Sequence, residues 1–163
     1  METLSVLKDI GLRGNGDIYL GVVGPVRVGK STFIKRFMEV LVIPHIKNED
    51  DKKRALDELP QSGMGKTIMT MEPKFVPSNA VEILVEENLT VKVRLIDCVG
   101  YIIENAQGYL EDGKMRMVKT PWFSETIPFD DAAKIGTQKV IKEHSTLGIC
   151  VLSDGTINEF TRE

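Results

Sequence analysis

The chain has 163 residues with a formal net charge of −3 at pH 7, and 42% of its residues are hydrophobic. This length suits one domain, and the composition is typical of a globular protein rather than of a disordered chain. A negative net charge argues against a general nucleic-acid binder, which usually carries a basic face. The longest apolar runs, such as residues 40–43, are far shorter than the ~20 residues of a membrane span. We therefore expect a globular domain with no transmembrane segment and no nucleic-acid partner.

The cysteines and histidines are few. Two cysteines, Cys98 and Cys150, cannot make a disulfide framework, and each lies in an apolar stretch that looks like a strand. Such residues are typical of buried, reduced thiols in the cytosol. The two histidines, His45 and His144, have no cysteine cluster nearby, which argues against a zinc site.

The first part of the chain alternates helical and strand-like patterns. Residues 1–13 carry leucine and isoleucine at helical spacing and predict a short amphipathic helix. Residues 18–23 form an apolar run bounded by glycine, which predicts a strand buried on both faces, as in a parallel sheet. Apolar residues between 33 and 41 recur at helical spacing and predict a helix that ends near Pro44.

The middle and the end of the chain predict a charged helix, a hairpin and a final helix and strand. Residues 47–59 are mostly charged and predict a solvated helix. Residues 60–79 are rich in proline and glycine and predict a long loop. Residues 81–96 predict two antiparallel strands joined by a tight turn. Residues 98–128 look irregular. After them the pattern predicts an amphipathic helix and a last apolar strand, over residues 129–145 and 147–152.

Residues 24–31, Gly-Pro-Val-Arg-Val-Gly-Lys-Ser, match the phosphate-loop pattern G-x-x-x-x-G-K-S/T. A predicted strand precedes the motif and a predicted helix follows it, which is the context that the pattern requires. The alternative is a glycine turn between strand and helix with an incidental lysine.

The chemistry of a phosphate loop explains these residue types. Gly29 would let the backbone approach the phosphates, and the loop N–H groups would form an anion nest at the helix N-terminus. Lys30 would reach the β- and γ-phosphates, and the Ser31 hydroxyl would ligate Mg²⁺. The predicted nucleotide-binding residues are Gly24, Pro25, Val26, Arg27, Val28, Gly29, Lys30, Ser31, Thr32 and Gly100.

An acidic residue, Asp97, stands at the end of the predicted hairpin. Residues 97–100, Asp-Cys-Val-Gly, match D-x-x-G, a pattern that is weak by itself. Asp97 ends an apolar strand downstream of the phosphate loop, where a carboxylate would approach Mg²⁺. The Gly100 N–H would then contact the γ-phosphate. The alternative for Asp97 is a cap at the end of a strand.

A threonine in the loop before the hairpin would complete the metal shell and sense the γ-phosphate. Thr70 is the predicted residue and Thr67 the second candidate, against the alternative that both are ordinary loop hydroxyls. The predicted metal ligands are therefore Ser31, Thr70 and Asp97.

Two further residues bear on hydrolysis. Arg27 lies in the middle of the phosphate loop, and we hypothesise that its guanidinium neutralises charge between the phosphates. The equally weighted alternative is a solvent-facing arginine. The predicted catalytic residues are Lys30, Asp97, Thr70 and Arg27. Tyr101 stands where many GTPases carry a glutamine that orients water. Water must then be placed by another loop, by backbone or by a neighbouring subunit, and we expect slow turnover.

The order of these motifs resembles the GTPase-related (TRAFAC) class of P-loop NTPases. The resemblance implies an α/β fold with a central, mostly parallel sheet and one antiparallel strand. The guanine-reading N-K-x-D motif and the last strands of such a fold are not seen in the sequence. We therefore expect residues 1–163 to be a partial NTPase domain.

A closer resemblance is to the stage IV sporulation protein A family of endospore-forming bacteria. It covers essentially the whole chain. The resemblance is carried by residues 17–24, 57–62, 65–70, 72–77, 97–101, 120–122, 136–141 and 143–146.

That resemblance implies a function. In the family this region is the N-terminal nucleotide-binding part of a protein about three times longer. It implies an ATPase that uses ATP and Mg²⁺ and self-assembles into a spore coat scaffold. It places Lys30 in the Walker A motif, Asp97 in Walker B and Thr70 among the sensor threonines. The family often has threonine where this chain has Val28 and a second sensor threonine where it has Met71.

The resemblance also implies partners and a location. The partners would be other copies of the chain, a small membrane-associated recruiting protein and other coat proteins. The location would be the mother-cell cytoplasm, at the outer surface of the forespore. A GTPase switch, in which the γ-phosphate orders residues 60–79, is an alternative. A scaffold in which the nucleotide is purely structural is another.

Overall fold

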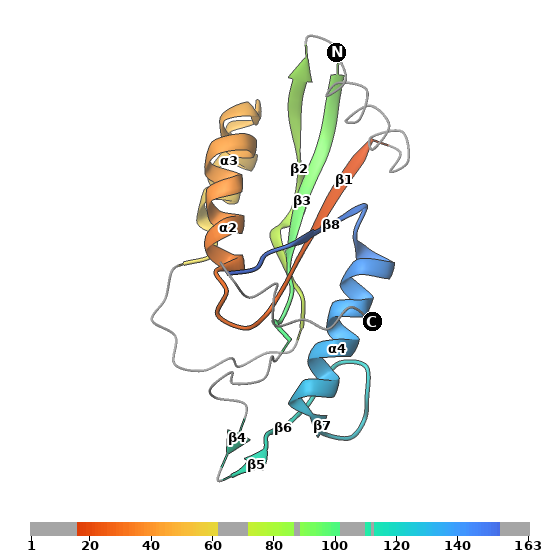
Figure 1. Cartoon of the computed structure of the whole chain (residues 1–163). Helices are drawn as coiled ribbons and strands as arrows, with labels where there is room; N and C mark the ends of the chain where they lie inside the picture. Colours follow the sequence, from red (N-terminus) through yellow and green to blue (C-terminus); the bar gives the residue numbers. More distant parts are fainter. Residues whose placement is uncertain (1–15, 62–71, 87–88, 102–109, 112, 154–163) are drawn as a thin grey trace.

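A computed structural model of the chain describes residues 16–61, 72–86, 89–101, 110–111 and 113–153 (Figure 1). The predicted helix over residues 1–13 and the two candidate sensor residues, Thr67 and Thr70, lie outside the described residues.

The core of the fold is a four-stranded sheet with the order β2-β3-β1-β8. β1 (Asp17–Val23) lies between β3 (Leu89–Asp97) and β8 (Leu147–Cys150) and is parallel to both. β2 (Lys74–Glu86) pairs with β3 in the antiparallel direction. The expected α/β fold, with a mostly parallel sheet and one antiparallel strand, is confirmed.

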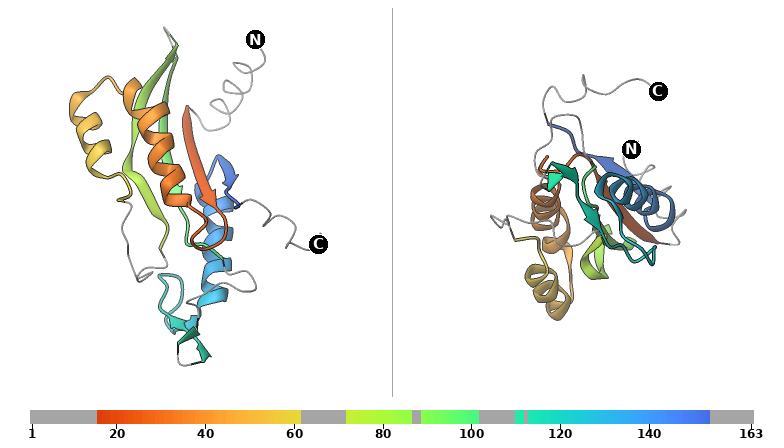
Figure 2. Two further views of the ribbon diagram at one scale, coloured as in Figure 1. Left: turned by 60° about the vertical axis from the view of Figure 1, so that its left-hand side comes forward. Right: turned by 90° about the horizontal axis from the view of Figure 1, so that it is seen from below.

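Helices flank this sheet on both sides (Figure 2). α2 (Lys30–Phe37) continues as a π-helical turn, Met38–Val42, and a 3-10 turn, Ile43–His45. α3 (Glu49–Asp57) follows, and its first turn is capped by Asn48. α4 (Phe129–Lys139) continues as the π-helical turn Val140–His144 on the other side of the sheet. All three helices were predicted, because their apolar or charged residues recur at helical spacing.

Two layers of apolar side chains bury the sheet. On one face Ile34 and Met38 pack against the strands with 0% exposure, together with Val22 and Leu95. On the other face Val140 packs with Val23, Ile96 and Cys98. The central strands are thus covered on both sides, which explains their continuous apolar runs.

The predicted loop over residues 60–79 is wrong in its last part, because Lys74–Asn79 belong to β2. Pro77 and Asn79 are typical of loops, yet the strand tolerates them at a sheet edge. Proline has no N–H to donate, and none is needed at Pro77 because the register between β2 and β3 shifts between Val76 and Val81. At this bulge the residues do not match a strand pattern, so the strand was not predicted there.

The segment predicted as irregular, residues 98–128, contains two short strand pairs. β4 (Leu110–Glu111) pairs with β5 (Lys114–Met115), and β6 (Met117–Val118) pairs with β7 (Ile127–Pro128). The nearby aromatic residues differ in environment. Phe129 is buried and Trp122 is half-buried near the Lys139 ammonium, whereas Phe123 is 48% exposed.

The two cysteines also differ. Cys98 and Cys150 are both unpaired thiols, but only Cys98 is buried. Burial raises the pKa of Cys98, which keeps its thiol protonated. The expectation of a buried Cys150 is wrong, because it lies on β8, which borders the sheet and pairs only with β1 among the described strands.

In the part of the chain that the structure describes, no helix is long and apolar enough to cross a membrane.

Candidate nucleotide-binding site

The predicted phosphate loop connects the end of β1 to the first turn of α2. Gly29 precedes the helix in the left-handed conformation, with φ 96°, which glycine adopts at low cost. Gly29 has no side chain to cap the helix. Its carbonyl accepts a hydrogen bond from the Phe33 N–H at 2.9 Å, which forms the first helical turn. An N-terminus without a side-chain cap presents N–H groups and positive partial charge to an anion.

Lys30 places a buried ammonium inside the curve of this loop. Its side chain is only 7% exposed, and Nζ donates to the carbonyl oxygens of Pro25 at 2.7 Å and Gly24 at 3.1 Å. Burial lowers the pKa of Lys30, while the carboxylate of Asp97 opposes that shift. The cation is thus desolvated and contacts neutral carbonyls, so an anionic ligand would find a strong partner there.

Ser31 and Asp97 meet beside this lysine. Ser31 Oγ donates to Asp97 Oδ2 at 2.6 Å, although the two residues are 66 positions apart. Burial raises the pKa of Asp97, and the Ser31 hydrogen bond and the Lys30 charge oppose that rise. A carboxylate and a hydroxyl are hard oxygen donors, and a partly desolvated carboxylate gains from a nearby cation. These two residues fit Mg²⁺ that keeps waters or phosphate oxygens as its other ligands.

The segment after Asp97 lies directly against the loop. A Cβ atom on Gly100 would lie 2.5 Å from the Val26 nitrogen and 2.6 Å from Lys30 Nζ, so only glycine fits there. Val26 N–H donates to the Tyr101 carbonyl at 3.0 Å. The backbone of Tyr101 therefore braces the phosphate loop, a role that the sequence did not indicate.

The start of the loop is packed just as closely. A Cβ atom on Gly24 would lie 2.2 Å from the Val151 carbonyl oxygen, and the Val151 N–H donates to the Val23 carbonyl at 2.9 Å. Val151 follows β8, more than a hundred residues downstream, and no local pattern links it to the loop.

The predicted site residues are brought together in part. Lys30, Ser31, Asp97 and Gly100 converge within hydrogen-bonding or contact distance. Arg27 is exposed on the loop and has a left-handed backbone, with φ 61°. Thr32 is exposed on α2. Of the other predicted loop residues, Gly24 and Pro25 are buried, Val26 and Val28 are half-buried and Gly29 is exposed.

A cavity of about 250 Å³ opens beside the first turns of α2. Ser31, Thr32, Lys35, Arg36 and Glu39 line it from the helix, and Pro60 and Gln61 line it from the segment after α3. Pro60 and Gln61 were not among the predicted site residues, although they lie within residues 57–62, which carry part of the family resemblance. The helical spacing of Thr32, Arg36 and Glu39 is the sequence signal for the helix side of this cavity.

A strand-to-helix loop that holds a buried lysine, at the carboxyl edge of a mostly parallel sheet, defines an α/β domain built to bind an anion. A family model described as "Stage IV sporulation protein A, ATPase domain" matches residues 1–163, and the chain belongs to this family. The resemblance to this family found in the sequence is confirmed, and residues 1–163 match its ATPase domain.

Curated relatives agree with this assignment. The chain is 60% identical over 162 residues to Stage IV sporulation protein A of Bacillus anthracis, and 58% identical over 162 residues to that of Bacillus subtilis (strain 168). It is 59% identical over 159 residues to that of Clostridioides difficile (strain 630). These matches cover 98–99% of the chain but only 32–33% of each relative, so the chain spans about a third of their length. No solved structure matches the chain.

Proposed function

We propose that the chain is a P-loop NTPase domain of the GTPase-related class that hydrolyses ATP with Mg²⁺. The observation that carries this proposal is the convergence of the buried Lys30 ammonium with the Ser31–Asp97 pair at the end of the phosphate loop. The family description, an ATPase domain, supports ATP as the nucleotide.

Each residue has a part in the reaction, which is attack of water on the γ-phosphoryl group. Loop N–H groups and Lys30 would hold the β- and γ-phosphates and stabilise the charge that develops as the bond to the leaving group breaks. Ser31 and Asp97 would hold Mg²⁺, which neutralises phosphate charge when bound. Ser31 Oγ and Asp97 Oδ2 lie 2.6 Å apart, so one cation would be close to both, with Asp97 holding it through water.

The remaining predicted residues complete the proposal. Thr70 would be the third metal ligand and γ-phosphate sensor, with Thr67 as its alternative. Gly100 would donate its N–H to the γ-phosphate, which its close approach to Lys30 favours. The Tyr101 phenol cannot present the paired amide groups of a glutamine, so we propose that water is placed by another loop, by backbone or by a neighbouring subunit.

Arg27 provides a test of charge stabilisation within the loop. Because its φ is 61°, Arg27→Gly removes the guanidinium without straining the backbone, and Arg27→Lys keeps a point charge. We expect the glycine variant to hydrolyse ATP about tenfold more slowly, with the lysine variant intermediate and the Kd for MgATP unchanged. Single-turnover rates and equilibrium binding check this. Wild-type rates in both variants would mean that Arg27 is a solvent-facing arginine with no part in hydrolysis.

Phosphate release from MgATP and from MgGTP, measured on the full-length protein, tests the nucleotide. We expect release from ATP and little from GTP. A preference for GTP would reject the ATP assignment and favour the GTPase switch. If phosphate is released from neither nucleotide, the remaining hypothesis is a scaffold in which the nucleotide has a purely structural role.

The role of the whole protein is part of the same proposal. We propose that residues 1–163 are the N-terminal part of a longer protein that couples hydrolysis to self-assembly of a spore coat scaffold. Its partners would be further copies, a small membrane-associated recruiting protein and other coat proteins. The location would be the mother-cell cytoplasm at the forespore surface. The length of the relatives supports a longer protein, and their name supports a role in sporulation.

A further inference from the structure

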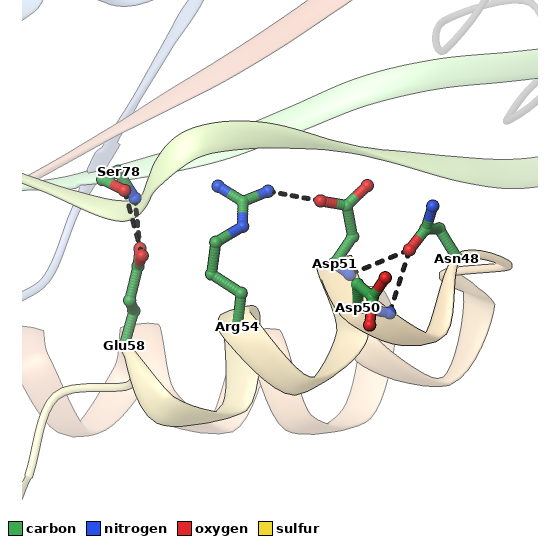
Figure 3. A network of polar contacts seen from close by, with 6 residues as sticks. All are labelled: Asn48, Asp50, Asp51, Arg54, Glu58 and Ser78. Atoms are coloured by element: carbon green, nitrogen blue, oxygen red, sulfur yellow. Dashed lines mark hydrogen bonds and ion pairs between the residues drawn. The ribbon is translucent and has the colours of Figure 1, made fainter.

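The end of α3 is tied to the sheet by a single glutamate (Figure 3). The Glu58 carboxylate accepts two hydrogen bonds from Ser78, one from its backbone N–H at 2.5 Å and one from its hydroxyl at 3.0 Å. On the other side of the same residue, Arg94 Nη1 donates to the Ser78 carbonyl at 3.2 Å. Ser78 is thus held by its N–H, its carbonyl and its side chain.

This tie is anchored on a rigid part of the sheet. Ser78 lies where β2 and β3 lose register, between Val76 and Val81, and it has no partner in the β2–β3 ladder. The guanidinium of Arg94 lies over the rings of Phe75 and Tyr19, 4.3 Å and 4.6 Å from their centroids. The bulge therefore presents a fixed donor pair to Glu58.

α3 is itself stiffened up to the point where Glu58 leaves it. Asn48 caps its first turn through the N–H groups of Asp50 and Asp51, and Arg54 pairs with Asp51 at 2.6 Å, as Figure 3 also shows. A displacement of Glu58 would thus move the chain that follows it rather than be absorbed within the helix.

Directly after Glu58 the chain forms one wall of the cavity beside α2. Leu59 packs against the main core, Pro60 is buried, and Pro60 and Gln61 line the same cavity as Ser31 and Thr32. Ser31 is one of the predicted metal ligands, so this cavity adjoins the place where the phosphates would be held. At about 250 Å³ it has room for part of a nucleotide, since whole small-molecule sites usually occupy about 300–1,000 Å³.

We propose that Glu58 is a positioning residue for the nucleotide, because its bonds to Ser78 hold Pro60 and Gln61 as the wall of a cavity that receives the nucleoside end. This inference rests on the proposed function of the phosphate loop. The cavity offers the hydroxyl of Thr32, the amide of Gln61 and the Lys35 ammonium, groups that suit a ribose and its attached phosphate. Glu58 acts through this wall and touches no reacting atom.

The test compares two ligands that share the phosphates and differ in the nucleoside. Dissociation constants of MgATP and of magnesium tripolyphosphate are measured on the full-length protein and its variants, together with kcat and KM. Glu58→Gln weakens the acceptor pair, and Ser78→Ala removes only the hydroxyl. Ser78→Thr keeps both donors, and Asp57→Asn makes the same charge change one residue earlier, at an exposed position.

We expect Glu58→Gln to raise the Kd and KM for MgATP about tenfold and Ser78→Ala about threefold, with kcat unchanged, because uniform binding is lost. Tripolyphosphate binding should not change, and Ser78→Thr and Asp57→Asn should behave as wild type. Thermal unfolding of each variant reports whether it is folded. If Glu58→Gln does not fold, the comparison is made with Ser78→Ala alone.

Two results would overturn the inference. The first is wild-type affinity for MgATP in both Glu58→Gln and Ser78→Ala. The second is an equal loss of ATP and tripolyphosphate binding, which would mean that the tie supports the phosphate loop rather than the nucleoside cavity. A wild-type protein that binds ATP without hydrolysing it would reject the proposed catalysis, yet the comparison of the two ligands would still decide the role of Glu58.

Discussion

Replacing Lys30 with alanine is expected to lower phosphate release from MgATP by about a hundredfold or more. The ammonium is buried and donates to the Gly24 and Pro25 carbonyls, and a bound phosphate would replace these neutral acceptors with charged ones. In this low-dielectric position its charge acts more strongly on the phosphates than it would in water. Phosphate release by the full-length protein, at saturating MgATP, measures the effect.

The matched control is Lys53→Ala, which removes an exposed ammonium from α3 and should leave the rate unchanged. Circular dichroism of both variants shows whether each is folded. Hydrolysis at the wild-type rate in a folded Lys30→Ala protein would reject the phosphate loop as the catalytic site. A variant that no longer hydrolyses ATP but still assembles normally would support the structural-nucleotide scaffold instead.

Replacing Asp97 with asparagine is expected to stabilise the protein without nucleotide and to abolish its stabilisation by MgATP. Burial raises the pKa of Asp97 in spite of the Ser31 hydrogen bond and the Lys30 charge, so the ionised carboxylate is less favourable in the folded state than in the unfolded state. Asparagine keeps the acceptor for Ser31 and removes the charge. We expect the unfolding temperature of the nucleotide-free protein to rise by about 3 °C at pH 7.

The same shift predicts a dependence on pH. A folded-state pKa above the unfolded one contributes stability that is complete below the unfolded pKa and is lost as pH rises through the folded pKa. The wild-type protein without nucleotide should therefore lose stability from pH 4 upward relative to Asp97→Asn, until the folded Asp97 is fully ionised. Thermal unfolding across this range, with Asp57→Asn as the charge control, checks the slope. The same dependence of unfolding temperature on pH in the wild type and in Asp97→Asn would contradict this prediction.

These two predictions share one physical basis. Lys30 and Asp97 both carry a charge that burial disfavours, as the lowered and the raised pKa values show. A bound nucleotide and metal ion would supply the missing opposite charges, so ligand binding should stabilise the folded state. The nucleotide-free site thus gives up stability in exchange for affinity and charge stabilisation.

The local patterns of the chain were enough to predict most of its secondary structure. The apolar run of β1, the helical spacing after Gly29 and the hairpin were all correct, because each depends on residues close together in sequence. The phosphate loop was predicted in the same way, from residues adjacent in the chain. The strand over Lys74–Asn79 was missed, because proline and asparagine hide a strand whose bulge removes the need for ladder hydrogen bonds.

The arrangement of the site depended on contacts that no local pattern contains. Parallel pairing of β1 with β3 places Val22 opposite Asp97, which brings the carboxylate to the edge where the loop begins. The bond between Ser31 and Asp97, the brace from Tyr101 and the tie from Glu58 to Ser78 join residues 20 to 75 positions apart. The sequence by itself determined which groups could do this chemistry. Only the packing of strands and helices decided which of them meet, because close approach between distant segments is set by the whole sheet and its core.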